Sequence, residues 1–306
     1  MLSVIIAALN SENTINHTLS SLHSNNLPSK EFEVVVVDNG STDKTVEVAK
    51  RYPVKIFSCA KRGQGAARNV GIAKARGEII CFTDSDIVVP EDWLAKILRF
   101  FEDCPHADGV GGPVLAPASG HLNNLQKLEG EIYARTHDFP AKIIESKFGD
   151  HVGSLYSANC AYRRNVLISS NGFDDSGFDA VDIDLCWRLI LKGKHLLFNP
   201  EMKVIHLGFP WNLKGVFRQQ FRWGESRGKL NMRYPSARAS NTGLKTRIFQ
   251  YYFFAVLFAQ ILYSKGRARS VLQLFERCAF TCGCISAYLK SYFGHKTDAS
   301  WMAVGD

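Results

Sequence analysis

The chain has 306 residues, enough to bury the core of one large domain or of one domain with an appendage. Hydrophobic residues make up 46% of the chain and charged residues 22%, which excludes global disorder. The formal net charge of +8 favours an anionic partner, such as nucleic acid, an acidic lipid or a phosphorylated substrate.

The eight cysteines are scattered and lack the paired spacing of a zinc site. Cys278, Cys282 and Cys284 cluster, but no histidine lies at ligand spacing, so we expect no metal there. This pattern indicates a reducing compartment. The opening MLSVIIAALN has no basic segment and no cleavage site, so it predicts a strand rather than a signal peptide.

Strands and helices alternate along the first hundred residues. Apolar runs predict strands at 2–8, 34–37, 54–57 and 79–83. Helical spacing predicts helices that include residues 15–22, 46–49, 65–74 and 93–101. This alternation is typical of a doubly wound α/β sheet, whose ligands bind outside the carboxyl ends of the strands.

Three acidic residues follow predicted strands: Asp38 after VVVV, and Asp84 with Asp86 after IICF. Alternate residues of a strand share a face, so we expect Asp84 and Asp86 to lie together with Phe82. Adjacent carboxylates repel each other unless a cation or protons neutralise them. A site with one or two carboxylates leaves Mg²⁺ or Mn²⁺ to be completed by substrate phosphates. For Asp38 alone, a polar loop residue remains the alternative.

The segment GQGAARNVG raises a rival interpretation. Gly63 and Gly65 could begin a dinucleotide-binding fingerprint, but Arg68 stands at the position of the third glycine. The segment also follows the third predicted strand rather than the first, so we disfavour a nicotinamide or flavin enzyme. An arginine in the first turns of this helix suits a phosphate or carboxylate partner instead.

The order of the motifs resembles that of family 2 glycosyltransferases. The matching segments are VIIAALNSE, VVVVDNGSTDKT, GQGAARNVGIAKARGEIICFTDSD, NGFDDSGFDAVDIDLCWRLILKGKHLLFNPEMKVIHL and RQQFRW. The resemblance implies the α/β GT-A fold, a Rossmann-like mixed or parallel sheet flanked by helices, with a C-terminal helical extension. It implies a catalytic domain at 1–235, with a nucleotide-sugar-binding half at 1–115 and an acceptor half at 116–235, and a helical tail at 240–306.

The resemblance also implies roles in binding a nucleotide sugar. Asn10 and Glu12 would lie in the first loop of the donor site. Asp38 would accept a hydrogen bond from the nucleotide base. Arg68 would help to hold the nucleotide end, and Asp84 would bind the ribose or share a metal.

The implied cofactor is Mn²⁺ or Mg²⁺, coordinated by Asp86 where it bridges the diphosphate. His206 resembles the family histidine that can complete the metal site, and a structural histidine is the alternative. Gln219, Arg222 and Trp223 of RQQFRW would meet the diphosphate and the acceptor, with Trp223 as a sugar-stacking surface. An exposed basic helix is the alternative for these three residues.

Transfer to a hydroxyl also needs a base. The acidic pair of the family falls on Val181 and Asp182, so the resemblance implies that Asp182 is the general base. A helix-start carboxylate is the alternative, and we expect Asp184 to support the site or the start of its helix. Two departures, Ala7-Ala8-Leu9 in the first loop and Val181 in the acidic pair, leave the donor open.

These features imply an inverting glycosyltransferase that moves a single sugar from a nucleotide-diphosphate sugar to a glycan or lipid-linked acceptor. A UDP-sugar is the expected donor. A non-catalytic nucleotide-sugar-binding or scaffold homologue is the alternative. Retention of Asp84, Asp86, Asp182 and Arg222 together favours the enzyme. A sugar-1-phosphate nucleotidyltransferase would need a glycine- and lysine-rich loop after the first strand, and AALNSENT is not one. We expect no nucleic acid partner.

The tract IFQYYFFAVLFAQILY at 248–263 is apolar and aromatic, and basic residues flank both ends. Its sixteen residues would span about 24 Å as a helix, short of the ~30 Å hydrocarbon core. We expect a helix at a membrane surface, on the cytoplasmic face, which makes the protein cytoplasmic and peripheral. A helix packed on the catalytic domain and a membrane-spanning helix remain alternatives.

Overall fold

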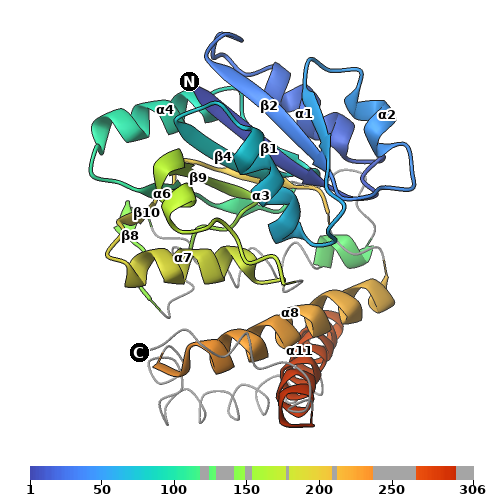
Figure 1. The fold of residues 1–306 in the computed structure, drawn as a ribbon. Coiled ribbons are helices and arrows are strands. Elements are labelled where there is room, and N and C mark those ends of the chain that lie inside the picture. The colour runs from blue at the N-terminus through green and yellow to red at the C-terminus, as the bar shows by residue number, and fades with distance from the viewer. Residues whose placement is uncertain are drawn as a thin grey trace. The chain divides into compact units, whose positions relative to one another are not determined.

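The structure is a computed structural model that describes residues 1–117, 124–128, 141–148, 154–176, 179–208, 212–236 and 267–293. The chain divides into two compact units (Figure 1). The first comprises Met1–Ala118 and His137–Gly208, and the second comprises Ser119–Thr136 and Phe209–Asp306. The helix that carries the RQQFRW motif belongs to the second unit. The domain boundary expected near residue 235 stays a prediction.

A mixed sheet with strand order β3-β2-β1-β4-β9-β6-β10-β8 forms the centre of the first unit. Its strands are β1 (Leu2–Ala8), β2 (Phe32–Asp38), β3 (Lys55–Ser58), β4 (Ile79–Asp84), β6 (Gly109–Gly111), β8 (Ile144–Glu145), β9 (Asn159–Arg163) and β10 (Leu196–Phe198). β1 pairs in parallel with β2 and β4, whereas β9 runs antiparallel to β4 and β6. A smaller sheet consists of β5 (Ile87–Val88), β11 (Val204–His206) and β7 (Val114–Leu115).

Helices cover both faces of the large sheet. They are α1 (Ile15–His23), α2 (Thr45–Ala49), α3 (Gln64–Lys74), α4 (Trp93–Asp103), α6 (Arg164–Ser169) and α7 (Val181–Leu191). The four strands and four helices predicted in the first hundred residues are all present, with bounds that differ by a few residues. The predicted α/β class with a mixed sheet is confirmed.

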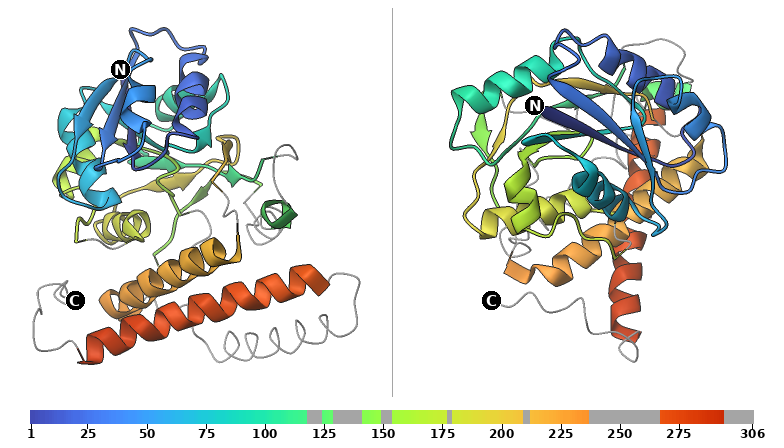
Figure 2. Two further views of the ribbon diagram at one scale, coloured as in Figure 1. Left: turned by 90° about the vertical axis from the view of Figure 1, so that its right-hand side faces the viewer. Right: turned by 45° about the horizontal axis from the view of Figure 1, so that its top comes forward.

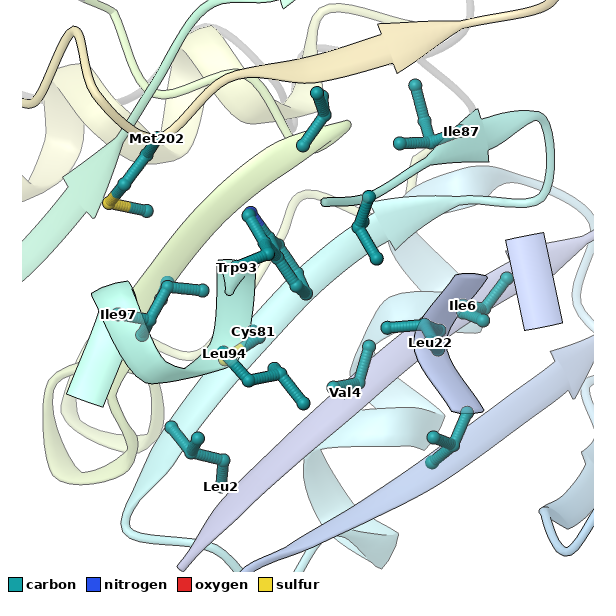
Figure 3. Close-up of a cluster of buried hydrophobic side chains, with 14 of the residues drawn as sticks. Leu2, Val4, Ile6, Leu22, Cys81, Ile87, Trp93, Leu94, Ile97 and Met202 are labelled. Carbon is teal, nitrogen blue, oxygen red and sulfur yellow. The ribbon is translucent and has the colours of Figure 1, made fainter. Parts of the chain in front are cut away.

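One face of the sheet packs against α1 and α4 (Figure 3). Leu2, Val4 and Ile6 of β1 point into this cluster together with Trp93 and Ile97 of α4, and all five are fully buried. Burying an aliphatic side chain of this size contributes about 1.5–3 kcal/mol. The alternate residues of β1 thus supply much of the core on this face.

The opposite face of β1 is covered by α3. A Cβ on Gly71 would lie 2.4 Å from Cγ2 of Ile5, so glycine is what allows α3 to approach the strand this closely. Because β1 is buried on both faces, its sequence is a continuous apolar run rather than an alternation.

Asn159 connects the two sheets and α4 through three hydrogen bonds. Its side chain is fully buried, and Oδ1 accepts from the indole Nε1 of Trp93 at 2.9 Å. Its Nδ2 donates to the carbonyl of Pro113 at 3.0 Å and also to the carbonyl of Met202. The amide therefore pairs the Trp93 indole and the Met202 carbonyl, and it adds a second bond to the Pro113 carbonyl, which also accepts from the N–H of Val204.

In the second unit, α8 (Leu213–Arg233) and α11 (Arg267–Phe293) lie side by side (Figure 2). They cross at glycines, since a Cβ on Gly224 would lie 1.9 Å from the carbonyl oxygen of Phe280. A Cβ on Gly283 would lie 2.0 Å from the carbonyl oxygen of Phe221. A larger residue at either glycine would push the helices apart.

Within the described ranges, no helix is long and apolar enough to cross a membrane. The apolar tract at 248–263 lies outside the described residues, so its three alternatives stay predictions.

Replacing Asn159 by alanine tests the hydrogen-bonded connection. We expect Asn159→Ala to lower the free energy of unfolding by about 1–3 kcal/mol or more, because it leaves the Trp93 indole and the Met202 carbonyl unpaired. Denaturant unfolding measures this change. The matched control is Asn26→Ala at an exposed position, where the change should stay within about 0.5 kcal/mol. Equal stability of the two variants would contradict the assignment.

Candidate functional site

The predicted acidic residues gather where three parallel strands end. β1 lies between β2 and β4, and its residues Ala8 and Ala7 pair with Asp38 and Asp84. The carboxyl ends of the three strands and the loop after β1 therefore meet at one edge of the sheet, where open α/β sheets bind their ligands.

The loop after β1 carries Asn10 and Glu12. Asn10 has a positive φ of 51°, and its Oδ1 accepts from the backbone N–H of Thr42 at 2.9 Å. The carboxylate of Glu12 accepts from the backbone N–H of Lys44 at 3.0 Å. Both side chains thus shape the loop that follows β2.

Asp38 begins that second loop. Its Oδ1 accepts from the backbone N–H of Ser41 at 3.0 Å. The adjacent Asn39 joins the loop to the start of α3, since Nδ2 donates to the Lys61 carbonyl at 2.7 Å and Oδ1 accepts from Gly63 at 2.8 Å. Asn39 was not predicted from the sequence as a site residue. The Asn-Gly pair directly after the strand was the available signal.

A serine pair joins the first loop to the acidic motif. The hydroxyls of Ser11 and Ser85 lie 2.7 Å apart. The N–H of Ser11 also donates to Oγ1 of Thr45 at 2.6 Å. Neither serine was predicted from the sequence, although Ser85 stands between the two predicted carboxylates. Three loops at this edge are therefore interlocked by side chains.

Arg68 projects from α3 and is 1% exposed. Its Nη2 donates to Oδ1 of Asp84 at 2.8 Å, and its Nη1 donates to Gln64 at 3.2 Å. The guanidinium lies 5.5 Å from the centroid of the Phe173 ring. The Asp84 side chain remains 30% exposed. Arg68 thus neutralises Asp84 from the protein side and leaves the carboxylate accessible from solvent.

The loop that carries Phe173 is fastened to α3. Oδ1 of Asn69 accepts from the N–H of Phe173 at 2.8 Å, and its Nδ2 donates to the Phe173 carbonyl at 2.8 Å. A Cβ on Gly65 would lie 1.9 Å from the carbonyl oxygen of Asp174, so only glycine permits this contact. The pair of bonds fixes the ring beneath Arg68.

Asp86 lies in the turn after β4, so the strand alternation that was expected to group it with Asp84 ends before it. Its Oδ2 is instead 3.2 Å from Nε2 of His206, which β11 brings alongside by pairing His206 with Ile87. Burial raises the pKa of Asp86, but the bond from His206 outweighs it and the pKa is lowered. The same bond raises the pKa of His206 against the effect of burial. Asp84 and Asp86 therefore have separate partners of opposite charge, Arg68 for Asp84 and His206 for Asp86.

The Asp86 and His206 pair has the chemistry of an open metal site. A Cβ on Gly208 would lie 2.0 Å from Oδ2 of Asp86, so glycine keeps this side of the pair clear of a side chain. Asp84 is close enough to raise the pKa of His206 through its charge. In the part of the chain that the structure describes, no three His, Cys, Asp or Glu side chains form a closed metal cage. The residues fit a divalent cation whose shell is completed by phosphate oxygens.

Asp182 lies in the first turn of α7 and is partly buried. Its Oδ1 accepts from Ile183 N–H at 2.9 Å, and its Oδ2 accepts from Ser157 N–H at 3.2 Å. Burial raises the pKa of Asp182, the charge of Arg68 offsets part of the rise, and the charge of Asp84 adds to it. Asp182, Arg68 and Asp84 thus form one electrostatic cluster. Ser157 was not predicted from the sequence as a partner of Asp182.

Asp184 is fully buried and accepts from Nε of Arg188 at 2.8 Å. The same guanidinium donates to the carbonyls of Ser170 at 2.9 Å and Gly172 at 2.7 Å. Asp184 therefore orients Arg188, which fastens α7 to the Gly172 loop. This contact agrees with a supporting rather than a chemical role.

The remaining predicted residues lie on α8, in the second unit. Trp223 is 46% exposed, Arg222 is exposed and Gln219 is half-buried. Their roles toward the diphosphate and the acceptor stay predictions.

The sequence pattern of the family described as "Glycosyl transferase family 2" matches residues 3–169, more than half of the chain. The poly-beta-1,6-N-acetyl-D-glucosamine synthase of Staphylococcus epidermidis is 25% identical over 257 residues. This match covers 81% of the chain but 60% of the relative, so the chain spans less than two thirds of the relative's length.

Two solved structures share the fold. S. aureus TarS 1-349 in complex with UDP-GlcNAc has a TM-score of 0.57 at 18% identity, over 96% of this chain and 92% of that one. The mannosyltransferase PcManGT from Pyrobaculum calidifontis, in complex with GDP-Man and Mn²⁺, has a TM-score of 0.63 at 18% identity, over 96% and 88%. These likenesses confirm the predicted GT-A fold. The chain belongs to glycosyl transferase family 2.

Proposed function

We propose that this protein is a glycosyltransferase that moves one sugar from a UDP-sugar to a hydroxyl of a glycan or lipid-linked acceptor, with inversion at the anomeric carbon. The proposal rests chiefly on one observation, the electrostatic cluster of Arg68, Asp84 and Asp182 beside the Asp86 and His206 pair. A UDP donor is supported by the UDP-GlcNAc bound to TarS. The GDP-Man bound to PcManGT makes GDP the second nucleotide to test.

In the proposed donor site, Asp38 accepts a hydrogen bond from the N3–H of uracil. Each of its oxygens already accepts one backbone N–H and has a further lone pair to offer. Asn10 and Glu12 hold the surrounding loops in shape. Arg68 acts through Asp84, whose exposed side meets the ribose or the cation.

Asp86 and His206, with Asp84, would hold Mn²⁺ or Mg²⁺. The cation supplies positive charge for the diphosphate as it leaves. Arg222 and Gln219 are proposed to contact the diphosphate, and Trp223 to stack on the acceptor sugar.

Asp182 takes the proton of the acceptor hydroxyl. The acceptor oxygen then bonds to the anomeric carbon on the face opposite the diphosphate, whose C–O bond breaks with the electron pair leaving on the diphosphate. A single displacement of this kind inverts the configuration, so an α-linked donor gives a β-linked product. The raised pKa of Asp182 suits this role, because a base works best when its pKa approaches the working pH.

The metal assignment is tested by Asp86→Ala. We expect this variant to lose donor turnover, and its nucleotide affinity to become independent of Mn²⁺, because one ligand of the cation is gone. Donor hydrolysis over UDP-, GDP- and dTDP-sugars and calorimetric titration of the nucleotide, each with and without EDTA, measure both effects. Asp103→Ala, which removes an exposed carboxylate, is the control. Full Mn²⁺-dependent affinity in Asp86→Ala would refute the assignment.

The base assignment is tested by Asp182→Asn. This side chain keeps its size but cannot take a proton, so turnover should fall by about 10²–10⁴-fold while donor affinity stays unchanged. Single-turnover kinetics and product configuration are the measurements. Asp175→Asn, in an exposed ion pair with Lys61, should remain active. An active Asp182→Asn, or a product with retained configuration, would move the base elsewhere.

The pH profile supplies a second readout of Asp182. Because its pKa is raised, the carboxyl stays protonated to a higher pH than an ordinary aspartate, which titrates near 3.9. Activity at saturating metal should therefore rise with pH, with its midpoint above the pKa of an ordinary aspartate. The residual activity of Asp182→Asn should not show this rise with pH.

Peripheral membrane association is also proposed, and α8 supports it. Its first two turns expose Lys214 and Arg218 at a spacing of four residues, beside the exposed apolar residues Leu213 and Phe217. Basic and apolar residues in adjacent rows are typical of helices that lie on an anionic membrane surface.

Charge reversal tests this surface. Lys214→Glu combined with Arg218→Glu should weaken binding to anionic vesicles by about thirty-fold or more, since each basic residue contributes about 1 kcal/mol. Vesicle flotation measures the binding. The control, Lys30→Glu with Lys50→Glu, changes the net charge equally at exposed sites of the first unit. An equal loss in both variants would show that net charge alone drives binding.

A further inference from the structure

A cleft of about 420 Å³ opens at the edge of the large sheet opposite the candidate catalytic site. It lies where β4 begins and β9 ends, since Ile79 pairs with Arg163. β4 runs from this cleft to Asp84, which places the two sites about 17 Å apart at the usual rise of a strand. The cleft is thus separate from the candidate catalytic site.

Unpaired guanidinium groups line this cleft. Nε of Arg164 is buried and has no hydrogen-bond partner. Among the described residues, the guanidinium groups of Arg164 and Arg76 have neither a hydrogen bond nor an ion pair. Buried donors in folded proteins are nearly always satisfied, so the unpaired Nε of Arg164 points to a missing acceptor, whereas the side chain of Arg76 is exposed to solvent.

The backbone around these two arginines is fixed. The carboxylate of Glu33 accepts from the backbone N–H of Arg76 at 2.6 Å and from Nζ of Lys55 at 2.5 Å. The backbone N–H of Arg164 donates to the carbonyl of Glu78 at 2.8 Å. A ligand would therefore meet guanidinium groups on anchored backbone, which lowers the entropic cost of binding.

The charge of the cleft determines the class of ligand. Arg76, Arg163, Arg164 and one carboxylate residue, Glu78, line the cleft. The guanidinium of Arg163 is engaged by the carbonyls of Ala107 and Pro105, so Arg76 and Arg164 against Glu78 leave one positive charge in excess. Guanidinium groups match phosphate oxygens in both geometry and charge. The exposed Ile168 adds an apolar wall. We propose that this cleft binds a phosphate-bearing anion, either a free phosphorylated molecule or the headgroup of a lipid.

The test follows the Arg164 Nε–H resonance in the full-length protein, with EDTA present so that the proposed metal site stays empty. Titration with inorganic pyrophosphate should shift this resonance saturably. Calorimetry should show that Arg164→Gln and Arg76→Gln each weaken pyrophosphate binding by about tenfold or more. Arg51→Gln, at an exposed ion pair with Glu47, should bind as the unaltered protein does.

Dihexanoyl phosphatidic acid, used as soluble monomers, distinguishes the two sources of phosphate. Tighter binding than pyrophosphate at the Arg164 resonance would assign a lipid headgroup, and equal or weaker binding would assign a free anion. No saturable shift with either probe would overturn the proposal. The proposal would also be overturned if Arg164→Gln and Arg76→Gln bound the probes as tightly as the unaltered protein and kept its thermal stability.

Discussion

The buried guanidinium of Arg68 is the interaction on which the candidate site depends. Asp84 and Asp182 both lie in its electrostatic field, and without it their like charges would drive one carboxyl to take up a proton. Its place depends in turn on the Phe173 ring and on the backbone bonds that Asn69 makes to that residue. The charge balance of the site is therefore set by how α3 packs against the loop before α7.

Much of the first unit could be predicted because its central strands are long and buried on both faces. A continuous apolar run such as residues 2–8 has few alternatives to a buried strand, and the structure has β1 at these bounds. The acidic residues after β2 and β4 then follow from strand direction. Membership of a family with this fold explains why the order of several individually weak motifs was informative.

The parts that could not be predicted depend on contacts between residues far apart in the chain. The strands β5 and β11 have two and three residues, too few for a hydrophobic period, yet their pairing places His206 beside Asp86. Ser11 and Asn39 act through hydrogen bonds to other loops, and polar loop residues carry no sequence signal of their partners. Asp86 itself was misplaced on the strand face because β4 ends two residues earlier.

The glycine crossing of α8 and α11 limits how the chain can be shortened for biochemical work. Gly224 and Gly283 allow the two helices to pack closely, so that each buries part of the surface of the other. Val216 and Leu230 of α8 are also buried. A fragment that stops after α8 would expose this surface to water and leave the helix that carries Arg222 without support. An expression fragment intended to keep RQQFRW in its native conformation should therefore extend through residue 293.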